Sequence, residues 1–181
     1  MAEIDAFAAQ LLEEAKAFLE KGRNSAGEAK EAFLHASLNL AFCALEAHVN
    51  AIAEDFLTME DLSAHELSLL SEKKVELSDG TFRLTTQMQI YRIEDRILFL
   101  CHRFSKKSAL DKTAAYWSQF KDALGLRNNL THPKTPATVN QISVERALLA
   151  ILQLLDVVYK RIYGKRYPPA KRGLDSTIEL P

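Results

Sequence analysis

The residues best suited to chemistry in this sequence lie together in the segment RNNLTH at positions 127–132. On a helix, at about 100° per residue, one arc of roughly 140° holds Arg127, Asn128, Thr131 and His132. A guanidinium binds phosphate through several fixed N–H donors, and an imidazole can carry a proton near neutral pH. An amide beside them can orient the ring or a ligand. These are the groups that phosphodiester cleavage without a metal requires.

Sequence context separates this segment from a chance pairing of the two residue types. In a chain with this many arginines and histidines, the Arg-x4-His spacing arises by accident about one time in four. Arg96 and His102 form a similar pair, but the apolar residues 97–101 lie between them. We interpret that stretch as an ordinary amphipathic helix whose arginine reaches solvent. The segment 127–132 instead ends a predicted helix directly before Pro133, where side chains are commonly accessible.

The order of residue types in this segment resembles the signature of the HEPN superfamily of small helical-bundle proteins. That signature is an arginine, a polar residue and, after a short gap, a histidine, which here are Arg127, Asn128 and His132. The helical periodicity over most of the chain agrees with the fold of that superfamily. The resemblance implies a homodimer in which the motif helices of two subunits meet across a cleft and form a metal-independent endoribonuclease site.

The resemblance also implies a role for each residue of the motif. His132 would handle the proton of the ribose 2′-hydroxyl, Arg127 would stabilise charge on the phosphorane, and Asn128 would orient the group being cleaved. One imidazole cannot easily be base and acid at once, so two copies across a dimer fit this chemistry. Many HEPN proteins are toxins neutralised by a small nucleotidyltransferase antitoxin. Others are inactive modules that bind RNA, a nucleotide or a protein partner, which is the second alternative for this chain. The third alternative is that the motif is accidental and the chain is a scaffolding bundle.

A second set of polar residues follows one face of the predicted second helix. Steps of three and four residues join His35, Asn39, Cys43, Glu46 and Asn50. In one interpretation, Glu46 and Asn50 form a wall of the site. Glu46 then pairs with Arg127 or sets the charge of His132, and Thr131 gives further support. In the other interpretation, the stripe is the solvated side of a long helix.

The elements that must position these residues are helices. Apolar residues at three- and four-residue steps predict main helices over about 4–22, 26–57, 90–104, 111–132 and 148–162. Gly22 is placed to end the first helix, and Asp111 to cap the fourth. The hydroxyl-x-x-acid patterns Thr58–Asp61 and Ser63–Glu66 predict a short helix at 67–71, and the Asp79-Gly80 turn predicts a small hairpin from residues 75–77 and 82–84.

These elements indicate an all-α fold, an up-and-down bundle of four to five main helices with one small β-hairpin insertion. We expect a single HEPN-like bundle over residues 1–166 and a loosely ordered tail over residues 167–181. Residues 159–172 interleave tyrosines with lysines and arginines, as a surface for single-stranded nucleic acid can. We prefer the alternative that Tyr159 continues the core stripe and the cations follow a helix C-terminus. We interpret His48 and His65 as structural or exposed residues.

The overall composition is that of one globular domain. The 181 residues are 48% apolar and 26% charged, and no run approaches the roughly 18 uninterrupted apolar residues of a membrane span. The N-terminus lacks the pattern of a secretory signal. Cys43 and Cys101 lie in apolar helical patterns typical of buried reduced thiols, and the histidines show no zinc-site spacing. We therefore expect a cytoplasmic protein with no membrane association, no metal and no cofactor.

Overall fold

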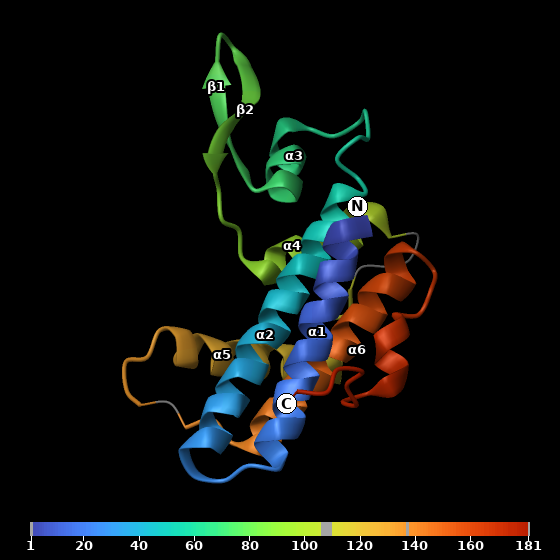
Figure 1. Cartoon of the computed structure of the whole chain (residues 1–181). Helices are drawn as coiled ribbons and strands as arrows, with labels where there is room; N and C mark the ends of the chain where they lie inside the picture. Colours follow the sequence, from blue (N-terminus) through green and yellow to red (C-terminus); the bar gives the residue numbers. More distant parts are fainter. Residues whose placement is uncertain (1, 106–109, 137, 181) are drawn as a thin grey trace.

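The computed structural model describes residues 2–105, 110–136 and 138–180 (Figure 1). Within these ranges the chain forms six α-helices, one two-stranded sheet and a short 3-10 helix. In chain order they are α1 (Ala2–Arg23), α2 (Gly27–Glu54), α3 (Ala64–Ser71), β1 (Lys73–Ser78), β2 (Thr81–Met88), α4 (Ile93–Phe104), α5 (Ala115–Thr131), α6 (Gln141–Ile162) and η1 (Pro168–Arg172). The prediction of an all-α helical bundle with a small β-hairpin insertion is confirmed.

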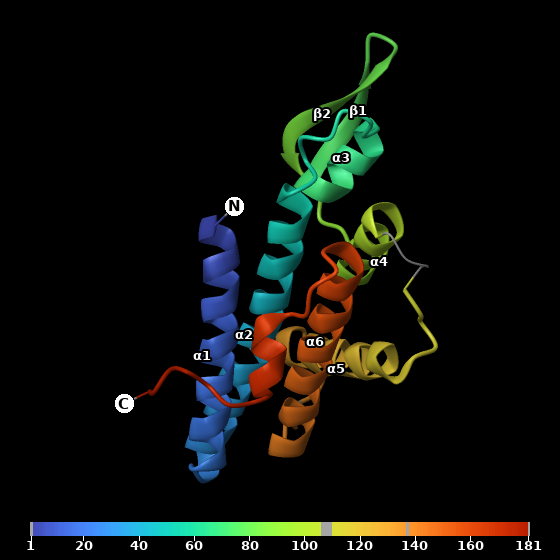
Figure 2. The same cartoon turned by 90° about the vertical axis from the view of Figure 1, so that its right-hand side faces the viewer.

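Three long helices, α1, α2 and α6, run side by side, and α5 lies across them (Figures 1 and 2). Helix α2 packs against both α1 and α6. Its buried residues surround much of its circumference, as expected for the central helix of a bundle. By length and composition alone α2 could also cross a membrane, but half of its most apolar 18-residue window is buried inside the protein. A core helix has the same properties.

Several predicted helix boundaries are wrong: α6 begins at Gln141 and not near 148, α3 begins at Ala64 and not at 67, and α2 ends at Glu54 and not at 57. Three other differences have a local reason. Gly22 lies inside α1, where an added Cβ would come within 3.0 Å of Leu34. The glycine therefore lets α1 and α2 approach closely and does not end the helix. Ile90 is exposed and precedes α4, which begins at Ile93. Asp111 accepts hydrogen bonds from the backbone and hydroxyl of Thr113, whereas the N-cap of α5 is Ala114.

The hairpin stands away from the bundle above α3 (Figure 1). Its turn residues Asp79 and Gly80 both have positive φ, 49° and 78°, as a type I′ turn requires. The turn sets an antiparallel register in which Leu77 lies opposite Phe82. Ser63 and Glu66 form a capping box at the start of α3, as their spacing predicts. Because β1 follows α3, β2 precedes α4 and the two strands are antiparallel, both ends of the hairpin lie next to each other beside the bundle.

The segment that follows α6 packs against the bundle, although we expected residues 167–181 to be loosely ordered. Tyr167 is buried, and Glu13 on α1 accepts hydrogen bonds from Arg172 at 2.7 Å and from the backbone of Thr177 at 2.8 Å. The same carboxylate pairs with Lys16 at 3.1 Å, whose side chain is fully buried. These bonds outweigh burial and keep the pKa of Glu13 below its usual value. The periodicity of apolar residues could not reveal these polar contacts.

A candidate polar pocket between α2, α4 and α5

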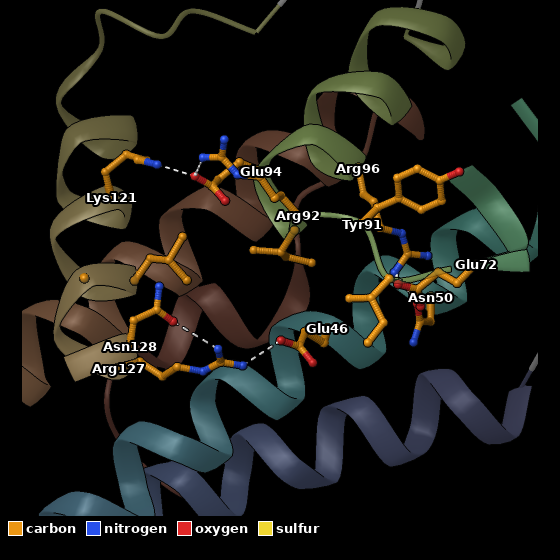
Figure 3. A pocket seen from close by; sticks show the side chains of 14 residues that line it. Glu46, Asn50, Glu72, Tyr91, Arg92, Glu94, Arg96, Lys121, Arg127 and Asn128 are labelled. Atoms are coloured by element: carbon orange, nitrogen blue, oxygen red, sulfur yellow. Dashed lines mark hydrogen bonds and ion pairs between the residues drawn. The ribbon is translucent and has the colours of Figure 1, made fainter. Parts of the chain in front are cut away.

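A pocket of about 680 Å³ opens between α2, α4, α5 and the two ends of the hairpin (Figure 3). Its wall carries four cations and three carboxylates: Arg92, Arg96, Lys121, Arg127, Glu46, Glu72 and Glu94. Two amides, Asn50 and Asn128, and several apolar side chains complete it. We call this site the polar pocket. Its size lies within the range of ligand sites, and its lining is more charged than is usual for them.

Arg127 is held at the rim of the polar pocket by two side chains. Its Nη2 lies 2.8 Å from Oε1 of Glu46, and its Nη1 donates to Oδ1 of Asn128 at 3.1 Å. The guanidinium also lies over the ring of Phe42, 5.5 Å from the ring centre. The side chain is 25% exposed. These bonds use two of the five N–H donors of a guanidinium, so the group is fixed in place and keeps donors for a ligand.

His132 and Thr131 lie at the end of α5, outside the lining of the polar pocket. His132 is the C-cap residue, and its backbone N–H donates to the carbonyl of Asn128 at 2.9 Å. Its side chain is exposed and makes no hydrogen bond or ion pair within residues 2–105, 110–136 and 138–180. The Thr131 hydroxyl donates to the carbonyl of Arg127 at 3.1 Å. The structure thus brings Arg127, Asn128, Glu46 and Asn50 to one pocket and leaves His132 beside it.

Asn50 bonds to Arg96 and not to Arg127. Its Oδ1 accepts from Nη1 of Arg96 at 2.7 Å, and Glu72 lies 3.1 Å from the same nitrogen. Arg96 also donates to the carbonyls of Leu69 and Leu70. The prediction that Arg96 reaches solvent is wrong, because its side chain is only 4% exposed. Burial lowers its pKa, and Glu72 opposes that effect.

The sequence reasoning missed a third charged group in the polar pocket. The buried carboxylate of Glu94 accepts from Nη2 of Arg92 at 2.8 Å and from Nζ of Lys121. Burial raises the pKa of Glu94, but the bonds from Lys121 and Arg92 outweigh it and hold the pKa below its usual value. Lys121 precedes Asn128 by seven residues, which is close to two helical turns. This spacing places the two side chains on one face of α5, and it could have indicated from the sequence that Lys121 belongs to the site.

The remaining members of the polar stripe on α2 do not line the pocket. His35 and Asn39 are half-buried, and Cys43 is exposed, contrary to the expected buried thiol. Glu46 pairs with Arg127, as one interpretation of the stripe predicts, whereas Asn50 lines the same pocket but bonds to Arg96. Cys101 is buried as expected, and burial raises the pKa of its thiol to about 11. Its thiol stays protonated at neutral pH.

A second polar region, which we call the His48 cluster, comprises His48, Tyr159, Tyr167 and Asp5. The His48 side chain is 1% exposed, and its Nε2 lies 2.6 Å from the hydroxyl of Tyr167. Nδ1 faces the hydroxyl of Tyr159, which donates to Asp5 at 3.1 Å. Burial lowers the pKa of His48 to about 4. Tyr167 packs inward, so its ring is not available for stacking on a nucleic acid base.

Comparisons with models of known protein families, with curated proteins and with solved structures found no significant match. The resemblance to the HEPN superfamily therefore depends on the Arg127–His132 motif together with the helical bundle. The geometry of the polar pocket is independent of that resemblance.

Proposed function

We propose that this protein is a HEPN-type, metal-independent endoribonuclease that acts as a cytoplasmic homodimer, with residues 127–132 at the dimer cleft. The observation that carries the proposal is the arrangement of Arg127. Glu46 and Asn128 hold its guanidinium at the rim of a pocket, and the exposed imidazole of His132 follows at the end of the same helix. Phosphate binding and proton transfer are the chemistry of these two groups.

In this mechanism, the 2′-oxygen of a ribose attacks the adjacent phosphorus while His132 takes the proton of the 2′-hydroxyl. The bond from phosphorus to the 5′-oxygen breaks, and an imidazolium gives that oxygen a proton. The products are a 2′,3′-cyclic phosphate and a 5′-hydroxyl. Arg127 stabilises the charge of the phosphorane, and the amide N–H groups of Asn128 orient the phosphate, because its Oδ1 is taken up by Arg127.

The dimer is part of the proposal because one chain does not bring its own imidazole into the polar pocket. His132 is exposed at the end of α5 and does not line the pocket that holds Arg127. A second copy can place the partner's His132 near Arg127 and also supply the second proton carrier that the reaction needs. A chain that stays monomeric under conditions in which it cleaves RNA would contradict this shared site.

A second candidate is a non-catalytic module of the same fold that binds RNA, a nucleotide or a protein partner, including a nucleotidyltransferase-type antitoxin. The ion pair between Arg127 and Glu46 favours it, because a paired arginine stabilises the extra charge of a phosphorane less well than a free one. This candidate predicts salt-sensitive binding that weakens in Arg127→Ala, with no product formed.

The two candidates are separated by incubating the purified protein with RNA in the presence of a chelator. The proposal predicts cleavage by the wild type, and little or none by His132→Ala or Arg127→Ala. Matched controls are His102→Ala on α4 and Arg83→Ala on β2, which remove exposed side chains of the same types away from the pocket. Absence of cleavage by the wild type, or equal cleavage by wild type and His132→Ala, overturns the enzymatic proposal. Binding without product supports the second candidate.

A further inference from the structure

The polar pocket is larger than one phosphate at Arg127 requires. Its volume of about 680 Å³ is that of a site for a whole small ligand. Arg127 and Glu46 occupy one part of it, and Arg92, Glu94 and Lys121 meet in another (Figure 3). The chemistry proposed for Arg127 leaves that second part without a role.

Among the residues that line the second part of the pocket, cations outnumber carboxylates. Arg92 and Lys121 are both exposed, and they share the single buried carboxylate of Glu94. Asp95, which does not line the pocket, forms a longer ion pair with Arg92 at 4.0 Å. The other two arginines of the pocket each have a carboxylate of their own, Glu46 for Arg127 and Glu72 for Arg96. The surplus cation therefore lies at Arg92 and Lys121, where Glu94 fixes both side chains.

Gly125 lies on α5 between the two positively charged places and lines the pocket. A glycine inside a helix is less stable than alanine, so its presence calls for a reason. A Cβ added at Gly125 would meet nothing within 4 Å, so packing inside the described chain does not require the glycine. The open space beside Gly125 leaves room for a ligand close to the surface of α5.

We infer that the polar pocket binds two neighbouring phosphates of one RNA strand, the first at Arg127 and Asn128 and the second at Arg92 and Lys121, with the linking sugar over Gly125. Lys121 and Arg127 are six residues apart on α5, roughly 9 Å along the helix axis. Their long side chains can converge on adjacent phosphates of a strand. The inference rests on the proposed function and specifies how the substrate lies in that site.

The occupant is a single strand because the pocket is enclosed by elements on several sides. Helices α2, α4 and α5 and the ends of the hairpin form its wall, and a volume of about 680 Å³ accommodates a short stretch of one chain. A duplex would have to be read from outside, through its wide minor groove. Ile93 and Leu124 provide apolar contact surface between the charged groups, which suits the sugar and base of a strand.

The salt dependence of binding tests the second phosphate position. The probe is a short single-stranded RNA of randomised sequence, and the measurement is its dissociation constant at several salt concentrations. For a single strand, each phosphate that the protein neutralises adds about 0.7 to the slope of log K against log salt. We expect Lys121→Ala to lower the slope by that amount and to weaken binding roughly five- to tenfold. Lys121→Arg keeps the charge and should restore binding, and Lys112→Ala, an exposed lysine outside the pocket, should bind like the wild type.

Substitutions at Gly125 test the same inference without changing any charge. Gly125→Ala should raise the thermal midpoint of unfolding, because the helix gains propensity and the methyl group meets nothing in the chain. Gly125→Leu should fold but weaken RNA binding at least as much as Lys121→Ala, because its side chain fills the path between the two phosphates. In a cleavage assay, Lys121→Ala should raise KM and leave kcat nearly unchanged.

The outcomes distinguish this inference from the function on which it rests. If wild type binds RNA and Arg127→Ala lowers the salt slope, but neither Lys121→Ala nor Gly125→Leu changes binding, the second phosphate position is overturned and the proposed function stands. If wild type neither binds nor cleaves RNA, both are overturned. If duplex RNA of the same sequences binds as tightly as the single strand, the single-strand occupant is overturned.

Discussion

The polar pocket and the His48 cluster both gather hydrogen-bonded polar side chains, but in opposite surroundings. In the pocket, Arg127 is 25% exposed and paired with an exposed carboxylate, so a ligand can replace Glu46 without leaving a buried group unpaired. In the His48 cluster, the imidazole and the hydroxyl of Tyr167 are buried together, so losing either leaves the other unsatisfied. Burial, more than residue type, separates the polar groups available to a ligand from those that hold the fold together.

The polar pocket itself contains both kinds of group, those available to a ligand and those that support the fold, as Arg96 shows. It lines the same cavity as Arg127, yet it is buried and bonds to Asn50, Glu72 and two backbone carbonyls. Arg96 therefore belongs with the structural groups and fixes the end of α3 and the residue before β1 against α2. The difference between the two arginines can be tested one side chain at a time.

The largest expected effect separates the two arginines. Arg96→Ala empties the space of a buried side chain and leaves two backbone carbonyls, the exposed Asn50 carboxamide and the partly exposed Glu72 carboxylate without their partner, so it should cost about 3–5 kcal/mol of the free energy of unfolding. Arg127→Ala removes a partly exposed ion pair and should cost less than about 1 kcal/mol. Urea unfolding of both variants gives the comparison. Equal losses would show that Arg127 is as structural as Arg96.

The next effect is a pH dependence that comes from His48. Its pKa is about 4 in the folded chain and near 6.5 when unfolded, so the unfolded chain binds more protons between these values. The contribution of neutral His48 to the free energy of unfolding is complete above pH 6.5. It is lost as the pH falls towards 4, and the total loss is about 3 kcal/mol. Unfolding measured across this range should show the slope, and His48→Gln should flatten it. The groups that face the ring are Asp5, Tyr159 and Tyr167.

A smaller loss of the free energy of unfolding is expected when the hydroxyls of two tyrosines that differ in burial are removed. Tyr167→Phe removes the buried hydroxyl partner of His48 and should cost about 1–3 kcal/mol. Tyr163→Phe removes an exposed bond to Asp55 and should cost less than about 0.5 kcal/mol. Thermal or chemical unfolding of the two variants is the measurement. Equal effects would mean that Tyr167 does not support His48 as the geometry indicates.

The smallest effect on stability should come from Glu46→Gln, because Glu46 is exposed. This variant should change the free energy of unfolding by less than about 0.5 kcal/mol. It should bind RNA roughly threefold more tightly, since a negative charge leaves the pocket, and cleave it more slowly, since Arg127 loses its positioning partner. RNA binding that is unchanged in Glu46→Gln would show that the pair does not regulate access to Arg127.

Most of the fold could be predicted because apolar periodicity and turn chemistry act locally. The Asp79-Gly80 turn and the Ser63 cap each occur where the sequence places them. The charged contacts were harder, because their partners are distant in the chain. Arg96 lies three residues after Ile93 and four before Leu100, on the buried face of α4, which should have indicated burial. Its partner Glu72 follows α3, and no local pattern joins the two.

Only part of the candidate site could be predicted from the sequence. The motif at 127–132 pointed to Arg127 and Asn128, and the stripe on α2 pointed to Glu46, which the structure brings to Arg127. Lys121, Arg92 and Glu94 were missed because the motif joins only an arginine and a histidine that are close in sequence. The position of His132 outside the pocket could not be predicted either, since it depends on where α5 ends.

The contacts between Glu13 and the segment after α6 also bear on how the chain folds during synthesis. Arg172 follows Glu13 by 159 positions and is made after α6. Until then, α1 and α2 can pair, but Lys16 and Glu13 lack the cover that residues 172–177 supply. The buried charges of the N-terminal helical hairpin can therefore be enclosed only after the segment that follows α6 has been synthesised.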